Sequence, residues 1–170
     1  MELGAECGFI MFKRLMHGPV LERIQTGAFL FIMGFWRRTT LGARAMLVDG
    51  NKVLLIKHTY TSGWSFPGGG VEVGDSALAT AKKELCEETG YRAADQGRIL
   101  SIYHNIEASR RDHVVLFVFK EFGQAHPFTP SAEISEMGWF AIDDLPHDAT
   151  DATLRRIEEF FSGAEISEIW

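Results

Sequence analysis

The chain has 170 residues, of which 46% are hydrophobic and 24% are charged, and this globular composition excludes a disordered or collagen-like protein. Its length suits one domain with a single core, alone or with an appendage. The 17 basic and 23 acidic side chains leave a net charge of −6, which argues against a general nucleic-acid binder with a basic face. An anionic small substrate would need a cation to bridge it to such a protein.

Cysteine content and hydropathy both favour a cytoplasmic protein. The two cysteines, Cys7 and Cys86, are too few for a disulfide-stapled secreted fold, so we expect reduced thiols. The most apolar stretch covers residues 27–36, whereas a bilayer span needs about 20 residues. A secretory signal carries its positive charge before the apolar run, but here Arg37 and Arg38 follow it. We therefore expect no membrane span and no secretory signal.

Residues 1–40 are expected to form an N-terminal extension that is helical or irregular. Two short apolar segments, Phe9–Met16 and Ala28–Trp36, are separated by Gly18-Pro19. We interpret the second segment as a helix buried against the domain or against a partner subunit, which makes a homodimer one expected arrangement. A helix lying on a membrane surface is the alternative.

Residues 41–170 are expected to form one α+β domain. The apolar runs 43–48 and 53–56 flank a turn signal, Asp49-Gly50-Asn51, and predict a β-hairpin. A helix is predicted over 76–89, with Asp75 or Ser76 as its N-cap and Gly90 just past its end. Further strands are expected at 98–103, 114–119 and 138–142, and a last helix at about 150–161, with Leu154, Ile157, Phe160 and Phe161 on one face. Hairpins mixed with two or three helices indicate a layered helix–sheet–helix fold.

The helix predicted over 76–89 would carry an apolar stripe beside an acidic one. At 100° per residue, one arc of about 80° holds the apolar set Leu78, Ala81, Leu85 and Thr89. A neighbouring arc of about 100° holds Glu84, Glu87 and Glu88. Like charges at these spacings destabilise an isolated helix, and only Lys83 is placed to pair with Glu87.

An all-oxygen cluster of this kind suits a hard cation such as Mg²⁺, which binds carboxylates, carbonyls and water. The glycine-rich stretch Pro67–Gly70 precedes the helix, and its backbone can approach a ligand closely because no Cβ intervenes. The alternative is a solvated acidic helix end that follows a flexible loop.

Residues 69–91 resemble the Nudix box, Gly-x5-Glu-x7-Arg-Glu-U-x-Glu-Glu-x-Gly-U, in which U is an aliphatic or bulky apolar residue. The matching positions are Gly69, Glu84, Leu85, Glu87, Glu88, Gly90 and Tyr91. Two positions depart: Asp75 stands where the first Glu belongs, and Lys83 stands where the Arg belongs. The stretches 64–68, 133–140 and 144–146 also look like parts of such domains, so the resemblance covers about residues 41–162.

The resemblance implies a mixed sheet between helices and Mg²⁺-dependent hydrolysis of a nucleoside diphosphate linked to another group, X, with Mn²⁺ as a substitute ion. Water would attack a phosphorus of the pyrophosphate. Glu87, Glu88 and the Gly68 carbonyl would be metal ligands, and Glu84 a ligand or the base that activates water. Asp75 and Lys83 would support and orient these glutamates, with a geometry altered by the shorter Asp and by an ammonium in place of a planar fork.

Other candidates depend on weaker signals. In some members of the family a glutamate beyond the box binds metal or acts as the base, which makes Glu133 and Glu136 candidates; the alternative is a solvated loop. Lys57, His58 and Arg44 are candidate substrate-binding residues, because they lie at the end of a strand leading to the glycine stretch or interrupt an apolar strand. The connection that could contact X contains His104, Asn105, Arg110 and Arg111.

The sequence leaves the substrate open beyond a nucleotide or nucleotide derivative. Downstream residues typical of the ADP-ribose, NADH and diadenosine-polyphosphate subfamilies are absent from the expected positions. A ligand-binding or regulatory module of the same fold, without turnover, is the alternative function. A prenyl-diphosphate isomerase shares the fold but needs a cysteine at a carbon centre, and neither Cys7 nor Cys86 is obviously placed for that.

Overall fold

The structure is a computed structural model, and it describes residues 39–170. The expectations for the N-terminal extension, including its part in a dimer, therefore lie almost wholly outside the described residues. Within that described range, no helix is long and apolar enough to cross a membrane.

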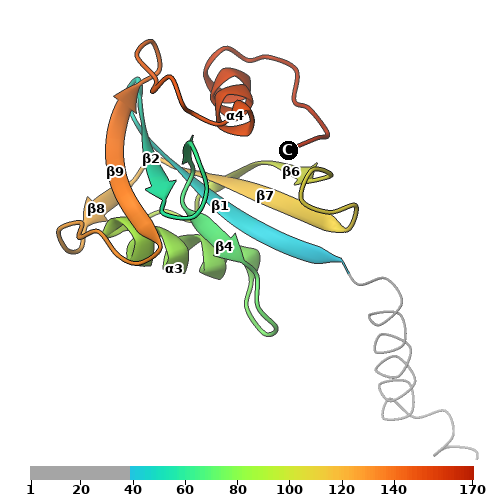
Figure 1. Ribbon diagram of the computed structural model, residues 1–170, viewed down its shortest axis with the longest axis horizontal. Coiled ribbons are helices and arrows are strands. Elements are labelled where there is room, and N and C mark those ends of the chain that lie inside the picture. The colour runs from blue at the N-terminus through green and yellow to red at the C-terminus, as the bar shows by residue number, and fades with distance from the viewer. Residues whose placement is uncertain (1–38) are drawn as a thin grey trace, which may run out of the picture. The chain divides into compact units, whose positions relative to one another are not determined.

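Nine strands and two helices follow one another along the described part of the chain (Figure 1). In order they are β1 (Thr40–Asp49), β2 (Lys52–His58), β3 (Trp64–Ser65), β4 (Gly68–Gly70), α3 (Ala77–Thr89), β5 (Tyr91–Ala93), β6 (Arg98–His104), β7 (Asp112–Phe119), β8 (Phe122–Gln124), β9 (Ile134–Ala141) and α4 (Asp151–Phe161).

Strand β1 is the centre of a mixed seven-stranded sheet. It runs parallel to β7 from the pair Thr40–Asp112 to the pair Leu47–Phe119. On its other side it is antiparallel to β4 over its first half and to β2 at its end, where Val48 faces Val53. The order is β3-β2-β1-β7-β6, with β4 added to β1 and β9 added to β2, and β5 and β8 form a separate pair. The predicted hairpin and mixed sheet are confirmed.

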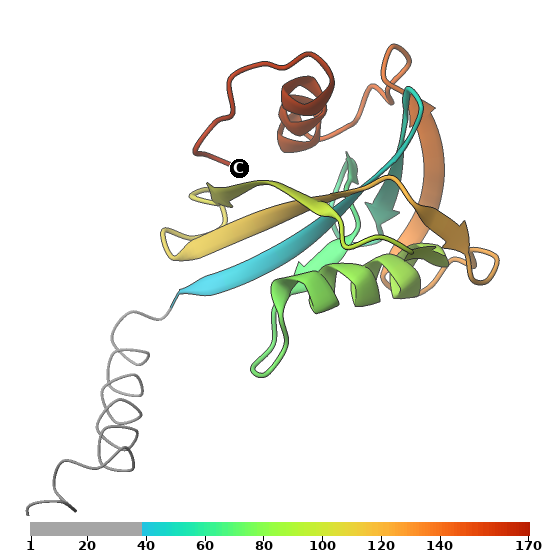
Figure 2. The same ribbon diagram turned by 180° about the vertical axis from the view of Figure 1, so that it is seen from behind.

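Alternating side chains of β1 enter two cores, one on each face of the sheet, because successive residues of a strand point to opposite faces. Ala43, Ala45 and Leu47 pack with α3, whereas Met46 and Val48 pack on the face that α4 covers. Figures 1 and 2 show α3 and α4 on opposite sides of the sheet. This arrangement confirms the predicted helix–sheet–helix layering.

Helix α3 begins and ends close to where its sequence predicts. The Ser76 side chain accepts a hydrogen bond from the Ala79 amide at 3.1 Å, which caps the first turn. Gly90 ends the helix with φ of 76°, and a Cβ there would lie 2.3 Å from the His126 carbonyl oxygen. Only glycine fits that position, because it needs a left-handed backbone and leaves no room for a side chain.

The glycine-rich stretch is a strand and not the loop that its composition predicts. Gly68, Gly69 and Gly70 pair with β1. A Cβ on Gly68 would lie 2.1 Å from the Ala43 carbonyl oxygen, and its φ is +145°. Glycine has low strand propensity but permits this close pairing, so a local prediction is wrong here. Strands β3, β5 and β8 were not predicted either, because two or three residues carry no periodicity.

The buried face of α4 agrees with the prediction only in part. Ile157 is buried, and Phe160 and Phe161 pack against the core, as expected. Leu154 is instead 39% exposed, while Arg156 is fully buried and Glu159 is 7% exposed. The Arg156 Nη2 atom donates to Glu159 Oε1 at 2.6 Å, and the Tyr103 hydroxyl donates to Glu159 Oε2 at 2.9 Å. Burial raises the pKa of Tyr103, and the hydrogen bond to the Glu159 carboxylate raises it further. The pair can enter the core because each charge finds partners there.

Candidate active site

Glu88 on α3 is the buried carboxylate of the candidate site. It is 9% exposed, and its Oε2 atom accepts a hydrogen bond from the Gly68 amide at 2.7 Å. Burial raises the pKa of Glu88 to about 7, while the Gly68 amide and the Arg44 charge partly oppose that rise. The carboxyl is therefore poised to change its charge near neutral pH.

Glu84 lies one helical turn earlier, beside the glycine strand. A Cβ on Gly69 would come within 2.8 Å of the Glu84 Cδ atom, so only glycine lets this side chain lie against β4. Burial raises the pKa of Glu84, and the neighbouring Glu87 raises it further. Glu87 itself is exposed. Two of the three helix carboxylates are thus held near the glycine backbone, and the third faces solvent.

Arg44 brings a positive charge to these carboxylates from β1. Its Nη1 atom donates to the Gly68 carbonyl, opposite which it lies in the β1–β4 pairing. Burial lowers the pKa of Arg44, and Glu88 and Glu84 counteract this effect. Because a guanidinium stays protonated in proteins, Arg44 is a permanent cation among the site's oxygens.

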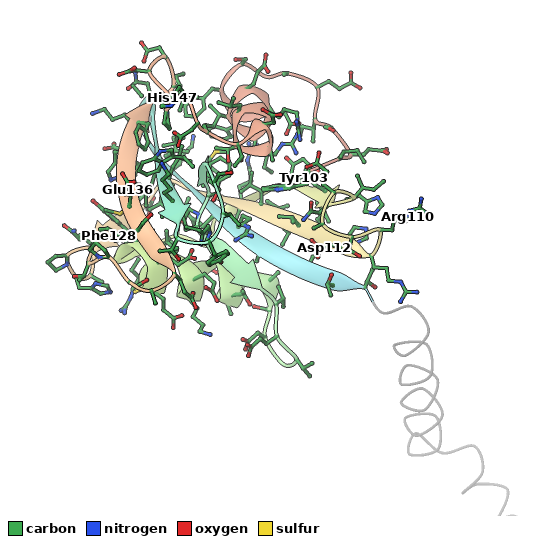
Figure 3. The ribbon with its side chains drawn as sticks, viewed as in Figure 1. Tyr103, Arg110, Asp112, Phe128, Glu136 and His147 are labelled. Atoms are coloured by element: carbon green, nitrogen blue, oxygen red, sulfur yellow. The ribbon has the colours of Figure 1, made fainter. Side chains whose placement is uncertain are left out.

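Glu133 and Glu136, the two candidate glutamates that follow the box in the sequence, have different neighbours in the structure. Glu133 lies close enough to Glu84 and Glu88 to raise the pKa of both. Glu136 instead has its Oε1 atom 3.9 Å from the Lys57 Nζ atom. Figure 3 shows Glu136 on β9, on the other side of the domain from Asp112. Glu133 is therefore the better placed of the two to act with the helix carboxylates.

Lys57 and His58 are neighbours in β2 but have different surroundings. Lys57 donates to Asp148 Oδ2 at 2.9 Å, and this hydrogen bond raises the pKa of Lys57 and lowers that of Asp148. Burial and the Arg44 charge lower the pKa of His58, so its ring is neutral at pH 7. Its buried Nδ1 atom has no hydrogen-bond partner within residues 39–170.

The two positions that depart from the box pattern are not joined in this structure. Asp75 and Lys83 are both exposed, and no ion pair links them in the described part of the chain. Lys83 does lower the pKa of Glu84 through its charge. A positive residue at this position therefore acts on the carboxylates directly, whether or not it contacts Asp75.

A cleft of about 570 Å³ opens beside Arg44 and His58. It extends along the loop that contains Tyr60 to the start of α4. The other side chains that give it its character are Thr61, Ser62, Asn105, Glu107, Asp151, Arg155 and Trp170. Of the four residues expected to contact X, only Asn105 lines this cleft, whereas His104, Arg110 and Arg111 do not. The remaining lining residues were not predicted, because the loops that contribute them are far apart in sequence. Trp64 is buried and packs against Phe140 in a T-shaped arrangement, with 4.7 Å between the ring centroids.

The oxygens of the candidate site are of the chemical kind that binds a divalent cation. Among residues 39–170, no three His, Cys, Asp or Glu side chains are close enough to hold a metal ion as they stand. The Gly68 carbonyl nevertheless accepts a hydrogen bond from a positive group, the Arg44 guanidinium, whose charge Glu88 and Glu84 also attract. Carboxylate and carbonyl oxygens are the ligands that Mg²⁺ prefers.

Known proteins share both the sequence pattern and the fold. Residues 38–160 match the family model of the NUDIX domain. A Bacillus subtilis protein named "Putative 8-oxo-dGTP diphosphatase" is 31% identical over 120 residues, which are 71% of this chain and 78% of that protein. An ADP-ribose pyrophosphatase of Methanocaldococcus jannaschii is 30% identical over 63% of this chain and 68% of its own length. The crystal structure of a MutT NUDIX hydrolase from Burkholderia pseudomallei aligns with a TM-score of 0.61 and 28% identity, covering 71% of this chain and 96% of that one.

Proposed function

The chain belongs to the Nudix family of pyrophosphohydrolases, and from this premise we propose that it uses Mg²⁺ to hydrolyse a pyrophosphate bond in a nucleotide or nucleotide derivative. The observation that carries the proposal is the group formed by Glu84, Glu88, the Gly68 carbonyl and Arg44 beside a cleft. Carboxylates alone would repel an anionic substrate, so this group needs a bridging cation. The proposed catalytic domain covers residues 41–170.

The proposed metal ligands are the Gly68 carbonyl and the carboxylates of Glu84, Glu87 and Glu88. A divalent ion bound there neutralises phosphate oxygens and lowers the pKa of water, and Mn²⁺ can replace Mg²⁺ in that chemistry. Glu87 is exposed, so its side chain can turn toward the ion without leaving a buried contact. Asp75 and Lys83 keep a supporting role in this proposal, Lys83 through its charge.

In this proposal, a carboxylate near the attacking water accepts its proton. As the water oxygen bonds to phosphorus, the bond from phosphorus to the bridging oxygen breaks and the water's proton must be accepted. Glu133 and Glu84 are the candidates, because Glu133 is exposed and electrostatically coupled to Glu84. A glutamine at the true base position would lower kcat more than it raises KM.

Arg44 and His58 are proposed to bind phosphate oxygens at the inner end of the cleft. Arg44 supplies a planar cation that matches phosphate geometry. His58 supplies a ring nitrogen that is buried and unpaired in the described part of the chain. Lys57 can join them only by leaving Asp148, so we rank its contribution third.

The rest of the cleft lining, apart from Arg44, His58 and Arg155, carries mainly oxygen acceptors. Glu107 and Asp151 contribute carboxylates, and Thr61 and Ser62 contribute hydroxyls. These groups accept hydrogen bonds from sugar hydroxyls or from base N–H groups and repel a second polyphosphate. The relatives named for 8-oxo-dGTP and ADP-ribose hydrolysis act, by those names, on compounds with a base and sugar attached to phosphates. We therefore propose that a nucleoside or its sugar contacts these groups. We also propose that the enzyme is cytoplasmic.

A nucleotide panel tests the proposal. The protein is incubated with Mg²⁺ and with nucleoside triphosphates, oxidised nucleotides, ADP-ribose and nucleotide sugars, and the products are identified by mass spectrometry. Cleavage between two phosphorus atoms, lost in the Glu88→Gln variant and retained in Glu158→Gln on the exposed face of α4, is the expected result. Tight binding of a panel member without any turnover would instead favour a ligand-binding module.

A further inference from the structure

Arg44 contacts an oxygen atom that the proposed metal ion would also use. Its guanidinium donates to the Gly68 carbonyl, which is a proposed metal ligand. The amide of the same residue donates to Glu88, so both sides of the Gly68 peptide unit are engaged. A carbonyl that accepts from a cation at this position is a poor partner for a second cation.

The charges around Arg44 explain why it is drawn there. The acidic groups close enough to raise the pKa of Arg44 include Glu88 and Glu84 on α3 and Asp112 on β7. Glu133 adds further negative charge beside the same two helix carboxylates. Without another cation, Arg44 is the group that compensates the buried Glu88 carboxylate.

The backbone of Arg44 is fixed, but its side chain has a second place to go. Strand β1 is held on both sides, with Arg44 opposite Gly68 on β4 and opposite Leu116 on β7. The side chain is only partly buried and also lines the cleft, together with His58 and Tyr60. A change of side-chain rotamer, with no movement of the sheet, can therefore bring the guanidinium from the carbonyl into the cleft.

We propose that Arg44 stands in for the metal ion in the metal-free enzyme and turns into the cleft, toward the substrate's pyrophosphate, when the ion binds. This inference rests on the proposed function, because it takes the Gly68 carbonyl as a ligand. Arg44 is then a substrate-binding residue that competes with the metal until phosphate oxygens attract it. Since coupling between two ligands is reciprocal, pyrophosphate strengthens metal binding and the metal strengthens pyrophosphate binding.

A purely structural role for Arg44 predicts the opposite response to its removal. If Arg44 only held Glu88 and Gly68 in place, its loss would loosen the metal ligands and weaken metal binding. If Arg44 competes with the ion, its loss frees the carbonyl and removes a like charge, so metal binding becomes tighter. The sign of the change in metal affinity separates the two roles.

Calorimetric titration with MgCl₂ alone measures this sign in wild type, Arg44→Gln and Arg155→Gln. Arg155 is the matched control, because it lines the same cleft but donates to the Trp170 carbonyl instead. We expect about tenfold tighter Mg²⁺ binding in Arg44→Gln and no change in Arg155→Gln. Equal or weaker binding in Arg44→Gln overturns the inference, while absence of Mg²⁺ binding in all three proteins overturns the proposed function itself.

A second measurement uses the wild-type protein, so it does not depend on the folding of a variant. The ¹⁵N resonance of the Arg44 Nε–H group is assigned by its loss in Arg44→Lys and is followed during addition of Mg²⁺. We expect this resonance to shift as the metal binds, because the guanidinium leaves the carbonyl. A resonance that stays in place at saturating Mg²⁺ overturns the inference.

Discussion

Two buried glutamates lie on opposite faces of the sheet and have very different partners. Glu159 on α4 accepts hydrogen bonds from the Arg156 guanidinium, the Tyr103 hydroxyl and the Ser167 amide. Within residues 39–170, Glu88 on α3 accepts one hydrogen bond, from the Gly68 amide, and its charged neighbours are Arg44 and other carboxylates. Their exposed fractions are nearly equal, at 7% and 9%.

The difference shows that burial alone does not tell a structural charge from a functional one. A buried charge with a counter-charge and several hydrogen bonds favours one arrangement of the core. A buried charge with too few partners destabilises the fold until something else binds, and such groups are concentrated at functional sites. Glu159 fits the first description, and Glu88 fits the second.

The largest expected effect comes from breaking the satisfied pair with Glu159→Gln. The change leaves the fully buried Arg156 without its counter-charge, so the free energy of unfolding should fall by about 3–5 kcal/mol. Urea denaturation measures this loss, and kcat per folded molecule should change little. Glu158→Gln, one residue away and exposed, should stay within about 0.5 kcal/mol of wild type. A loss below about 1 kcal/mol in Glu159→Gln would mean that the two glutamates do not differ in the way described.

Glu88→Gln should give the reverse result, with turnover lost and the fold kept. The amide keeps the shape of the side chain and can still accept from the Gly68 amide, but it removes the negative charge of a proposed metal ligand. We expect kcat to fall about 100-fold or more, on the order of 3 kcal/mol of transition-state stabilisation. Steady-state kinetics on the best substrate of the panel measures the loss. Near-normal kcat would place the metal elsewhere.

The raised pKa of Glu88 predicts how stability depends on pH without metal. Because the pKa is about 7 in the folded state, against an ordinary value of 4.5, folding favours the protonated carboxyl. The contribution of Glu88 to the free energy of unfolding is fully present below about pH 4.5 and is lost as pH rises through 7. The free energy of unfolding then falls by an amount on the order of 3 kcal/mol. The charge of Arg44 lowers the pKa of Glu88, whereas the charges of Glu84 and Glu133 raise it.

Urea denaturation in EDTA between pH 5 and pH 8 isolates that contribution as the difference between wild type and Glu88→Gln. The subtraction is needed because the pKa of Glu84 is also raised by burial, so its contribution to stability falls as pH rises in the same range. Saturating Mg²⁺ should stabilise the wild type more at pH 8 than at pH 6, since the ion binds the carboxylate form. An equal effect of Mg²⁺ at both pH values would argue against Glu88 as a ligand.

The smallest expected effect concerns Lys83. Lys83→Ala removes the positive charge that lowers the pKa of Glu84, so kcat should fall about tenfold at saturating Mg²⁺. Lys83→Arg keeps the charge and should match or exceed wild type. The neighbouring Lys82→Ala is the control. If Lys83→Ala equals wild type at saturating Mg²⁺, Lys83 is only a solvated lysine.

Local sequence predicts the functional helix much better than the structural pair. The caps and buried stripe of α3, and the spacing of its glutamates, follow from residues that are close together in the chain. The pairing of Arg44 with Gly68 and of Tyr103 with Glu159 joins residues 24 and 56 positions apart, which no local pattern encodes. The cleft was missed for the same reason. The apolar face predicted for α4 is confirmed for Ile157, Phe160 and Phe161, but the burial of Arg156 and Glu159 was missed because hydrophobicity ranks them as surface residues.

The parallel pairing of β1 with β7 has a consequence for the order in which the protein folds. Thr40 and Asp112, which begin the two strands, are 72 positions apart. Closing so long a loop costs entropy before any contact repays it, so contacts of this kind slow folding. During synthesis the strand that carries Arg44 must wait until β7 has left the ribosome. Until then, one long apolar edge of β1 stays open to aggregation, which chaperones would have to prevent.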